Sequence, residues 1–309
     1  MEPMEQEAGT FERLRPLLFS IAYRMIGSVT EAEDVVQEAF IRYHRAGADG
    51  ERIAEPKAWL SAVTTRLAID HLRSARVRRE TYVGPWLPEP VVERTEDVPS
   101  ASAELADSLS LAFLLVLERL NPVERAVFLL REVFDFGYDE IAEIVERNED
   151  NCRQLATRAR RHVEEERPRF RPSREHQAEL TLRFLEAVSE GDTDGLVGML
   201  AEDVALYSDS GGRVQAARRK VAGPKHVARL MTTVARAGAA RQGFRLVAHE
   251  ALVNGESGML LVDLNTGMVV TAFQLDIAPS GLIRQVLIVL NPDKLGGIVP
   301  PAGPGVALN

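Results

Sequence analysis

The sequence predicts a multidomain protein: two all-α helical domains, the second with a helix-turn-helix, and a C-terminal α+β domain that closes into a cone-shaped barrel. Three observations support this fold class. The chain has 309 residues, more than one small domain needs. Apolar residues recur at helical spacing through the first half. Strand-like runs separated by hairpin signals such as Asn254-Gly255 fill much of the second half.

Composition places the chain among globular proteins, with 45% hydrophobic and 27% charged residues. We expect a cytoplasmic protein, because we find no membrane-spanning run and no signal-peptide pattern. The single cysteine, Cys152, excludes internal disulfides and cysteine-rich zinc sites. The net charge of −9 is unevenly spread, since arginines cluster between Arg66 and Arg79 and between Arg153 and Arg171. Local basic patches of this kind remain compatible with DNA binding.

The first helical domain is expected over residues 8–80. Its predicted helices are Phe11 to Ile26, Glu31 to Arg45 with Thr30 as the cap, and Lys57 to Arg79 after Pro56. The second helix carries an acidic stripe of Glu31, Asp34 and Glu38. That stripe fits either a solvated face or a docking face for a basic partner helix.

A proline-rich acidic linker is predicted over residues 81–103, and its Trp86-Leu87 pair suggests an anchor on a neighbouring surface. The second helical domain follows over residues 104–167, with an apolar run from Leu109 to Leu120. Its helix-turn-helix pairs Tyr138 to Val145 with Asn148 to His162, where Asn148 is the expected cap and Cys152 lies on the apolar stripe. An ordinary amphipathic hairpin with a solvated basic face gives the same pattern.

A second linker, 168–174, leads to the α+β unit at 175–295. Its expected helices are Leu180 to Val188, Leu196 to Leu200 and Pro224 to Ala237, and its expected strands are Val204 to Tyr207, Phe244 to Val253, Gly258 to Leu264, Met268 to Ile277 and Leu282 to Leu290. The Gly- and Pro-rich residues 296–309 are expected to be disordered.

Several motifs resemble the extracytoplasmic-function sigma factors. Glu31 to Phe40, Pro56 to Leu60 and Asp70 to Arg73 resemble the second conserved region of that family, and Leu120 to Arg161 resembles the fourth. Trp86 to Pro90 matches the WLPEP motif of the sigma-J-like subgroup, which carries a fused SnoaL-like domain of the NTF2-like fold. Asn291 to Leu295 matches its NPDKL motif. The DGGGK motif stands here with Ser210 for a glycine and Arg213 for the lysine.

The resemblance implies an alternative sigma factor that binds core RNA polymerase at its clamp helices and flap, recognises promoter DNA and directs transcription initiation. It implies no enzyme, since the polymerase performs the chemistry. The residues implied for core binding are Glu31, Asp34, Gln37, Glu38 and Phe40. Those implied for the −10 element are Arg66, Asp70, Arg73, Arg76, Arg78 and Arg79. The recognition helix would read the −35 element with Asn151, Arg153, Gln154, Thr157, Arg158, Arg160 and Arg161.

In the resembling subgroup the fused domain regulates the sigma modules in cis. We therefore predict that three motifs meet at one regulatory surface between domains. They comprise Trp86, Leu87, Pro88, Glu89 and Pro90; Asp209, Gly211, Gly212 and Arg213; and Asn291, Pro292, Asp293, Lys294 and Leu295.

Two other interpretations use the same features. A helix-turn-helix regulator with a ligand-sensing C-terminal domain explains the recognition helix but leaves Glu31 to Phe40 and Arg66 to Arg79 without a role. An enzyme in the cone would need polar groups such as His226, His249, Glu250 and Asp263 to converge. A small-molecule ligand in the cone is a further interpretation. No metal-ligand spacing, phosphate loop or dinucleotide fingerprint is present, so we expect no metal and no cofactor.

Overall fold

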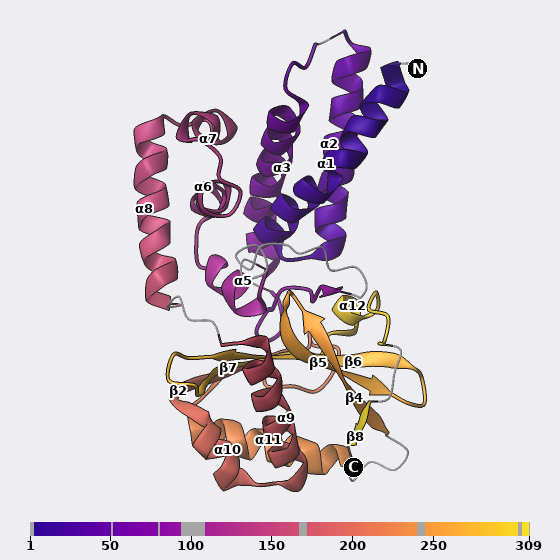
Figure 1. Cartoon of the computed structure of the whole chain (residues 1–309), viewed down its shortest axis with the longest axis vertical. Helices are drawn as coiled ribbons and strands as arrows, with labels where there is room; N and C mark the ends of the chain where they lie inside the picture. Colours follow the sequence, from indigo (N-terminus) through magenta and orange to yellow (C-terminus); the bar gives the residue numbers. More distant parts are fainter. Residues whose placement is uncertain are drawn as a thin grey trace. The chain divides into compact units, whose positions relative to one another are not determined.

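Figure 1 shows the computed structural model of the chain, which describes residues 3–50, 52–79, 81–93, 109–166, 172–239, 245–301 and 305–308. The chain divides into two compact units. One unit contains residues 1–81 and 116–167, and the other contains residues 82–115 and 168–309. Among the described residues, no helix combines the length and the low charge needed to cross a bilayer.

Three long helices form the first part of the first unit: α1 (Pro3–Ile26), α2 (Val29–Ala48) and α3 (Pro56–Arg79). The predicted helices were each found, with α1 beginning before Phe11 and α2 extending at both ends. The predicted cap Thr30 was wrong: Ser28 caps α2, and its hydroxyl accepts a hydrogen bond from the amide of Glu31 at 3.4 Å. Ser28 is favoured because Gly27, at φ +76°, turns the chain out of α1 just before it.

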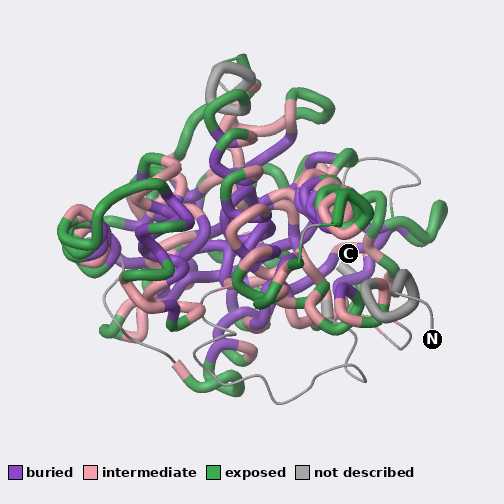
Figure 2. Tube along the Cα trace, turned by 90° about the horizontal axis from the view of Figure 1, so that it is seen from above, coloured by how far each residue is buried: buried purple, intermediate pink, exposed green. Residues whose placement is uncertain are grey.

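Three further helices complete this unit: α6 (Pro122–Glu132), α7 (Tyr138–Val145) and α8 (Glu149–Glu166). Asn121 and Glu124 form a reciprocal capping box at the start of α6. The α7 helix has the predicted bounds. The predicted cap of α8 is confirmed, since Asn148 Oδ1 accepts from the amide of Asn151 at 2.8 Å. Figure 2 shows buried and exposed residues alternating along the helices, as expected of amphipathic helices.

The second unit is an α+β fold around one sheet. Its strands are β1 (Val92–Glu93), β2 (Leu200–Asp209), β3 (Val221–Ala222), β4 (Leu246–Val253), β5 (Glu256–Asp263), β6 (Met268–Ile277), β7 (Ile283–Val289) and β8 (Val306–Leu308). The order is β1-β4-β5-β6-β7-β2-β3, with β8 also on β4. Only the β2–β7 pair is parallel among the described strand pairs.

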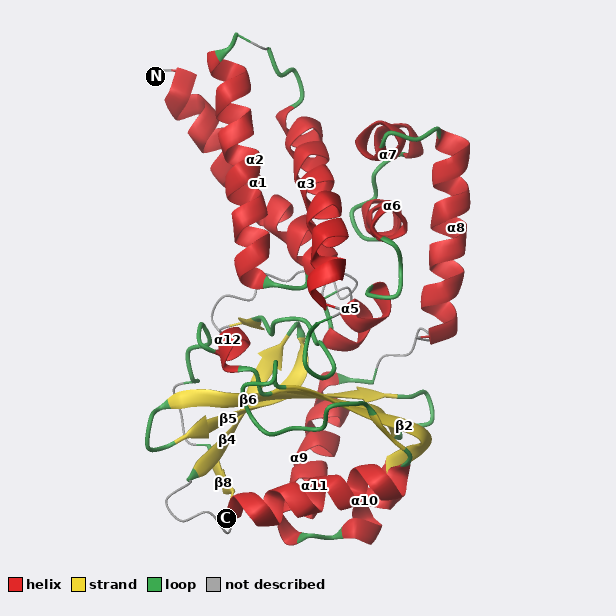
Figure 3. Ribbon diagram, turned by 180° about the vertical axis from the view of Figure 1, so that it is seen from behind, coloured by secondary structure: helices red, strands yellow, loops and turns green. Residues whose placement is uncertain are grey.

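Both faces of the sheet are covered, as Figures 1 and 3 show. On one face lie α9 (Arg174–Glu190), α10 (Thr193–Met199) and α11 (Pro224–Ala239), whose apolar side chains share a core with Phe273 and Leu275. On the other face, Leu87, residues of α5 (Leu111–Leu117) and Leu295 of α12 (Pro292–Leu295) form a second core. The apolar run from Leu109 to Leu120 contains α5, which covers only Leu111–Leu117.

Two segments are more ordered than the sequence predicted. Residues 82–93 are packed on the sheet, where Leu87 is fully buried and β1 extends the edge beside β4. The C-terminal segment is not wholly disordered, since β8 pairs with Leu246, Val247 and Ala248. The physical reason is the same in both places: the unpaired edge of β4 offers backbone hydrogen bonds that a passing segment can take up. The remaining residues of the predicted acidic linker, 94–103, and residues 104–108 of the predicted second helical domain lie outside the described residues.

Candidate functional site

The helix α8 presents the predicted polar face to solvent. Its buried side consists of Cys152, Ala156, Ala159 and Val163. Of the residues predicted to meet DNA, Arg153, Gln154, Thr157, Arg158 and Arg161 are exposed, and Asn151 and Arg160 are half-buried. This division of faces follows from the helical spacing in the sequence. The predicted burial of Cys152 is confirmed, and burial raises the pKa of its thiol, so the group is structural rather than reactive.

Four arginines of this face are held by glutamates. Arg153 pairs with Glu149 at 2.9 Å, and its guanidinium lies 4.5 Å from the ring centroid of Tyr138. The remaining pairs are Arg158 with Glu124, Arg160 with Glu132, and Arg161 with Glu165. The hydrogen bonds that Arg160 donates to Glu132 and Arg161 donates to Glu165 raise the pKa of each arginine. The pairs of Arg153 and Arg161 are exposed on both sides and contribute little stability, so a phosphate can replace the glutamate there at small cost.

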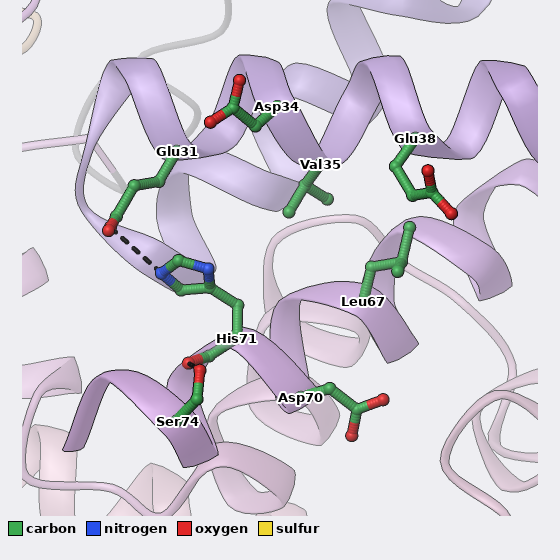
Figure 4. Close-up of a pocket in the computed structure, with 8 residues that line it drawn as sticks. All are labelled: Glu31, Asp34, Val35, Glu38, Leu67, Asp70, His71 and Ser74. Atoms are coloured by element: carbon green, nitrogen blue, oxygen red, sulfur yellow. Dashed lines mark hydrogen bonds and ion pairs between the residues drawn. The ribbon is translucent and has the colours of Figure 1, made fainter. Parts of the chain in front are cut away.

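A groove with a volume of about 380 Å³ lies between α2 and α3, and Figure 4 shows the residues around it. Three of the residues predicted to bind a basic partner lie here, namely Glu31, Asp34 and Glu38, and α3 adds Asp70. Glu31 Oε2 lies 3.1 Å from His71 Nε2 across the groove. Val35 and Leu67 also line it. Four carboxylates around an apolar floor suit a basic, amphipathic helix.

Two residues predicted for the same partner lie elsewhere. The ring of Phe40 packs against Phe11, with centroids 4.4 Å apart, and is not among the residues that line the groove. Gln37 is exposed on α2 but is also outside the lining. Three of the five residues predicted to bind polymerase thus line the groove and two do not. The roles of Gln37 and Phe40 stay predictions.

The arginines predicted to meet the −10 element are only partly described. Arg66 donates to the carbonyl oxygens of Ile144 and Glu143 at 2.9 and 2.7 Å, so it caps the C-terminal end of α7. In this arrangement Arg66 is committed to α7, and a DNA contact requires those bonds to break. Arg73 pairs with Asp70 at 3.1 Å and is exposed. The side chains of Arg76, Arg78 and Arg79 lie outside the described residues.

The three motifs predicted to meet do come together, around the carboxylate of Asp209. This buried group accepts from the hydroxyl of Tyr82 at 2.5 Å, from the amides of Leu87 and Gly211 at 2.8 and 3.1 Å, and from Lys294 Nζ at 2.7 Å. Burial, followed by the bond to Asp209, raises the pKa of Tyr82, which therefore stays protonated. The carboxylate of Asp209 is buried, and its burial is compensated by four donors, one of them a cation.

Lys294 joins the first and third motifs. Its ammonium donates to the carbonyl of Leu87 and lies 4.3 Å from the ring centroid of Trp86. Pro88 and Pro90 are buried beside it, and Glu89 is half-buried. At the solvent edge Arg213 pairs with Asp293 at 3.0 Å, so the arginine that replaces the motif's lysine still meets a carboxylate. Leu295 is buried in the core below, and Pro292 begins α12.

Gly211 and Gly212 are required by the geometry of this turn. Gly211 has φ +55°, and a Cβ there would lie 2.6 Å from Asn291 Nδ2. Gly212 has φ +75°, and a Cβ there would lie 3.1 Å from Val83. The serine at position 210 fits where the motif has glycine, because its hydroxyl accepts from the amide of Gly212 at 3.3 Å.

Two amide side chains that the sequence analysis missed fix the rest of this segment. Asn254 accepts from the amide of Val91 at 3.0 Å and donates to the carbonyl of Leu109 at 2.9 Å. Gln274 accepts from the amide of Leu111 at 3.2 Å. One signal in the sequence could have indicated this role. Gln274 lies in an apolar run, where a buried amide side chain needs hydrogen-bond partners.

The polar groups considered for catalysis do not converge. His226 and Glu250 are exposed, on α11 and β4. The carboxylate of Asp263 accepts hydrogen bonds from Asn265 and Thr266 in its own turn. The core between the helices and the sheet is lined by apolar residues that include Phe184, Met199, Met259 and Phe273. His249 is half-buried on β4, and among the described residues no hydrogen bond or ion pair joins any two of the four candidates.

Comparison with known proteins agrees with this geometry. The family models that match are Sigma-70 region 2, at residues 10–78, and Sigma-70 region 4, at residues 110–163. The ECF RNA polymerase sigma factor SigJ of Mycobacterium tuberculosis is 41% identical over 256 residues, covering 82% of this chain and 80% of the relative. A probable ECF RNA polymerase sigma factor of that species, SigI, is 39% identical over 198 residues, 63% of this chain and 67% of the relative.

A solved structure extends the likeness to the whole chain. The crystal structure of the extracytoplasmic function sigma factor SigJ of M. tuberculosis aligns with a TM-score of 0.74 and 34% identity, covering 95% of this chain and 99% of that one. The fold and the two helical regions thus define a sigma-70 type transcription initiation factor. The chain belongs to the extracytoplasmic-function RNA polymerase sigma factors, in the form that carries a fused C-terminal α+β domain.

Proposed function

We propose that the acidic groove between α2 and α3 is the surface that binds core RNA polymerase. The observation that carries this is the groove itself, where Glu31, Asp34, Glu38 and Asp70 surround an apolar floor.

We further propose that the exposed face of α8 reads the −35 element and that the second half of α3 contacts the −10 element. Helix α8 carries side chains suited to base edges, such as Gln154, and others suited to phosphates, such as Arg161.

Association with core polymerase tests the groove. We expect the double variant Asp34→Asn/Glu38→Gln to weaken binding about tenfold or more, because it removes two charges that face a basic partner. The matched control is Glu33→Gln on the same helix, whose carboxylate pairs with Arg15 at 2.6 Å and is not among the groove residues. Fluorescence titration of core polymerase gives both affinities. Equal affinity of the double variant and the unaltered chain would remove the groove from the proposal.

We also propose that the second unit regulates initiation in cis by holding the segment that connects the two helical regions. Residues 82–93 join α3 to the region that leads to α5, and they are fastened to the sheet by Asp209, Lys294 and Asn254. A fastened connector limits how the two regions can be placed on a promoter. If release of residues 82–93 raises transcription, the second unit is an inhibitor. If release lowers transcription, the second unit is an activator.

The variant Asp209→Asn tests this regulation. It removes the charge that Lys294 pairs with, and breaking a buried pair costs about 3–5 kcal/mol in comparable cases. We expect promoter-directed transcription to change severalfold in either direction. The control Asp203→Asn removes an exposed charge from the same strand, outside the three motifs, and should leave transcription unchanged. Protease cleavage within residues 82–93 reports release directly. Released connectors with unchanged transcription would contradict cis regulation.

A further inference from the structure

The second unit contains a long stretch without acidic residues. Between Ser210 and His249 there are nine lysines and arginines and no aspartate or glutamate, although the whole chain has a net charge of −9. The stretch includes β3 and α11. Neither the groove, the recognition helix nor the connector site uses these charges, apart from Arg213. They therefore need a separate explanation.

Six of the described cations of this stretch lie in two adjoining places. Arg218, Arg219 and Lys220 directly precede β3, which pairs with β2 at the end of the sheet. Gly223 then joins β3 to α11 without a further loop. On α11, positions 225, 229 and 236 fall within about 40° of one another around the helix axis and so share one face. We call this set the basic patch; its members are Arg218, Arg219, Lys220, Lys225, Arg229 and Arg236.

The basic patch is exposed and lacks counter-charges. All six residues are exposed, and none forms an ion pair with a carboxylate among the residues that the structure describes. Lys225 and Arg229 are like charges four residues apart, which destabilises a helix by a few tenths of a kcal/mol. Lys225 also lies in the first turn, where the helix dipole disfavours a cation. Such an arrangement is stabilised by an external polyanion.

The apolar residues of α11 argue against a membrane as that polyanion. Val227, Ala228, Leu230 and Met231 pack in the core against the sheet. Val234 is the one large hydrophobic residue that α11 exposes among its described side chains. A helix that lies in a lipid surface inserts its apolar face, and here that face is already occupied. Four of the six cations are arginine, whose planar guanidinium binds phosphate in a bidentate manner.

We infer that the basic patch contacts the phosphate backbone of double-stranded DNA outside the two promoter elements. The inference rests on the proposed function, because the chain must first be bound to a promoter through its helical regions before this unit can meet duplex DNA. The contact is independent of sequence, since the patch is formed by cations and offers phosphate recognition alone. The fused domain would in this way add affinity and strong salt dependence to promoter binding.

The test is the salt dependence of promoter binding by the holoenzyme, followed by fluorescence anisotropy between 50 and 200 mM KCl. The variant Lys225→Gln/Arg229→Gln removes two patch charges. The control Arg174→Gln/Arg183→Gln removes two exposed charges from α9, outside the patch. Each lost phosphate contact lowers the slope of log affinity against log salt by about 0.9. We expect the slope of the patch variant to be smaller by nearly two. Between 50 and 200 mM KCl, the loss of promoter affinity of the patch variant should therefore be roughly ten times smaller than that of the unaltered chain.

The outcomes separate this inference from the proposed function. Equal slopes for the patch variant, the control and the unaltered chain would overturn the inference, although promoter binding itself persisted. A patch variant that loses affinity for core polymerase with an unchanged DNA slope would identify an acidic protein surface as the partner, and would also overturn it. Failure of the unaltered holoenzyme to bind any promoter would reject the proposed function and this inference with it.

Discussion

At the residue scale, Asp209 shows how three short motifs become one site. Its carboxylate is buried and has donors from Tyr82, Leu87, Gly211 and Lys294. These donors come from segments more than 80 residues apart, so the contact could be predicted only because the motifs had been recognised. Asn254 and Gln274 belong to no such motif. Their roles depend on pairing with a segment over 140 residues away and were not predicted.

Gly211 gives a residue-scale prediction. We expect Gly211→Ala to destabilise the second unit by about 2–4 kcal/mol, because the residue has a positive φ and a Cβ there would meet Asn291. The control Gly267→Ala separates the two causes, since Gly267 has φ +68° but nothing within 4 Å. It should cost only about 1 kcal/mol. Thermal unfolding followed by circular dichroism measures both. Similar losses in the two variants would show that contact with Asn291 does not matter.

At the element scale, hydrophobic periodicity predicted the long helices and the central strands, and capping chemistry predicted the start of α8. Edge pairing was not predicted. The strands β1 and β8 have two and three residues, too few to show a period of two. They form because β4 has an open edge, which is a property of the folded sheet. The residues of β1 and β8 alone therefore do not predict this pairing.

The attachment of β8 to β4 can be tested at Gly305. A Cβ there would lie 2.2 Å from Val247 Cγ1 and 2.7 Å from the carbonyl oxygen of Ala248. We expect Gly305→Val to release β8, so that the amides of Val306 to Leu308 exchange hydrogen at least tenfold faster. The control Gly297→Ala has nothing within 4 Å of the added atom and should leave exchange unchanged. Protection of β8 in the Gly305→Val chain would contradict the close packing described here.

At the scale of the whole molecule, the chain combines an acidic groove that we propose binds polymerase, two segments that we propose contact promoter DNA, and a fused domain that fastens residues 82–93. The family assignment followed from motif order in the sequence and is confirmed by the two sigma-70 regions and by the likeness to SigJ over most of the chain. The engagement of Arg66 by α7 could not be predicted, because it depends on how α3 and α7 pack.

Transcription in vitro tests the central claim most directly. Core polymerase, with and without the chain, transcribes fragmented genomic DNA, and the 5′ ends of the transcripts are mapped. We predict a set of starts that requires the chain and shares two upstream elements. The variant Gln154→Ala should retain polymerase binding and lose about 5- to 150-fold of this transcription, the effect of removing one base contact worth about 1–3 kcal/mol. Starts identical to those of core polymerase alone, or loss of polymerase binding by Gln154→Ala, would contradict the assignment of α8 as the promoter reader.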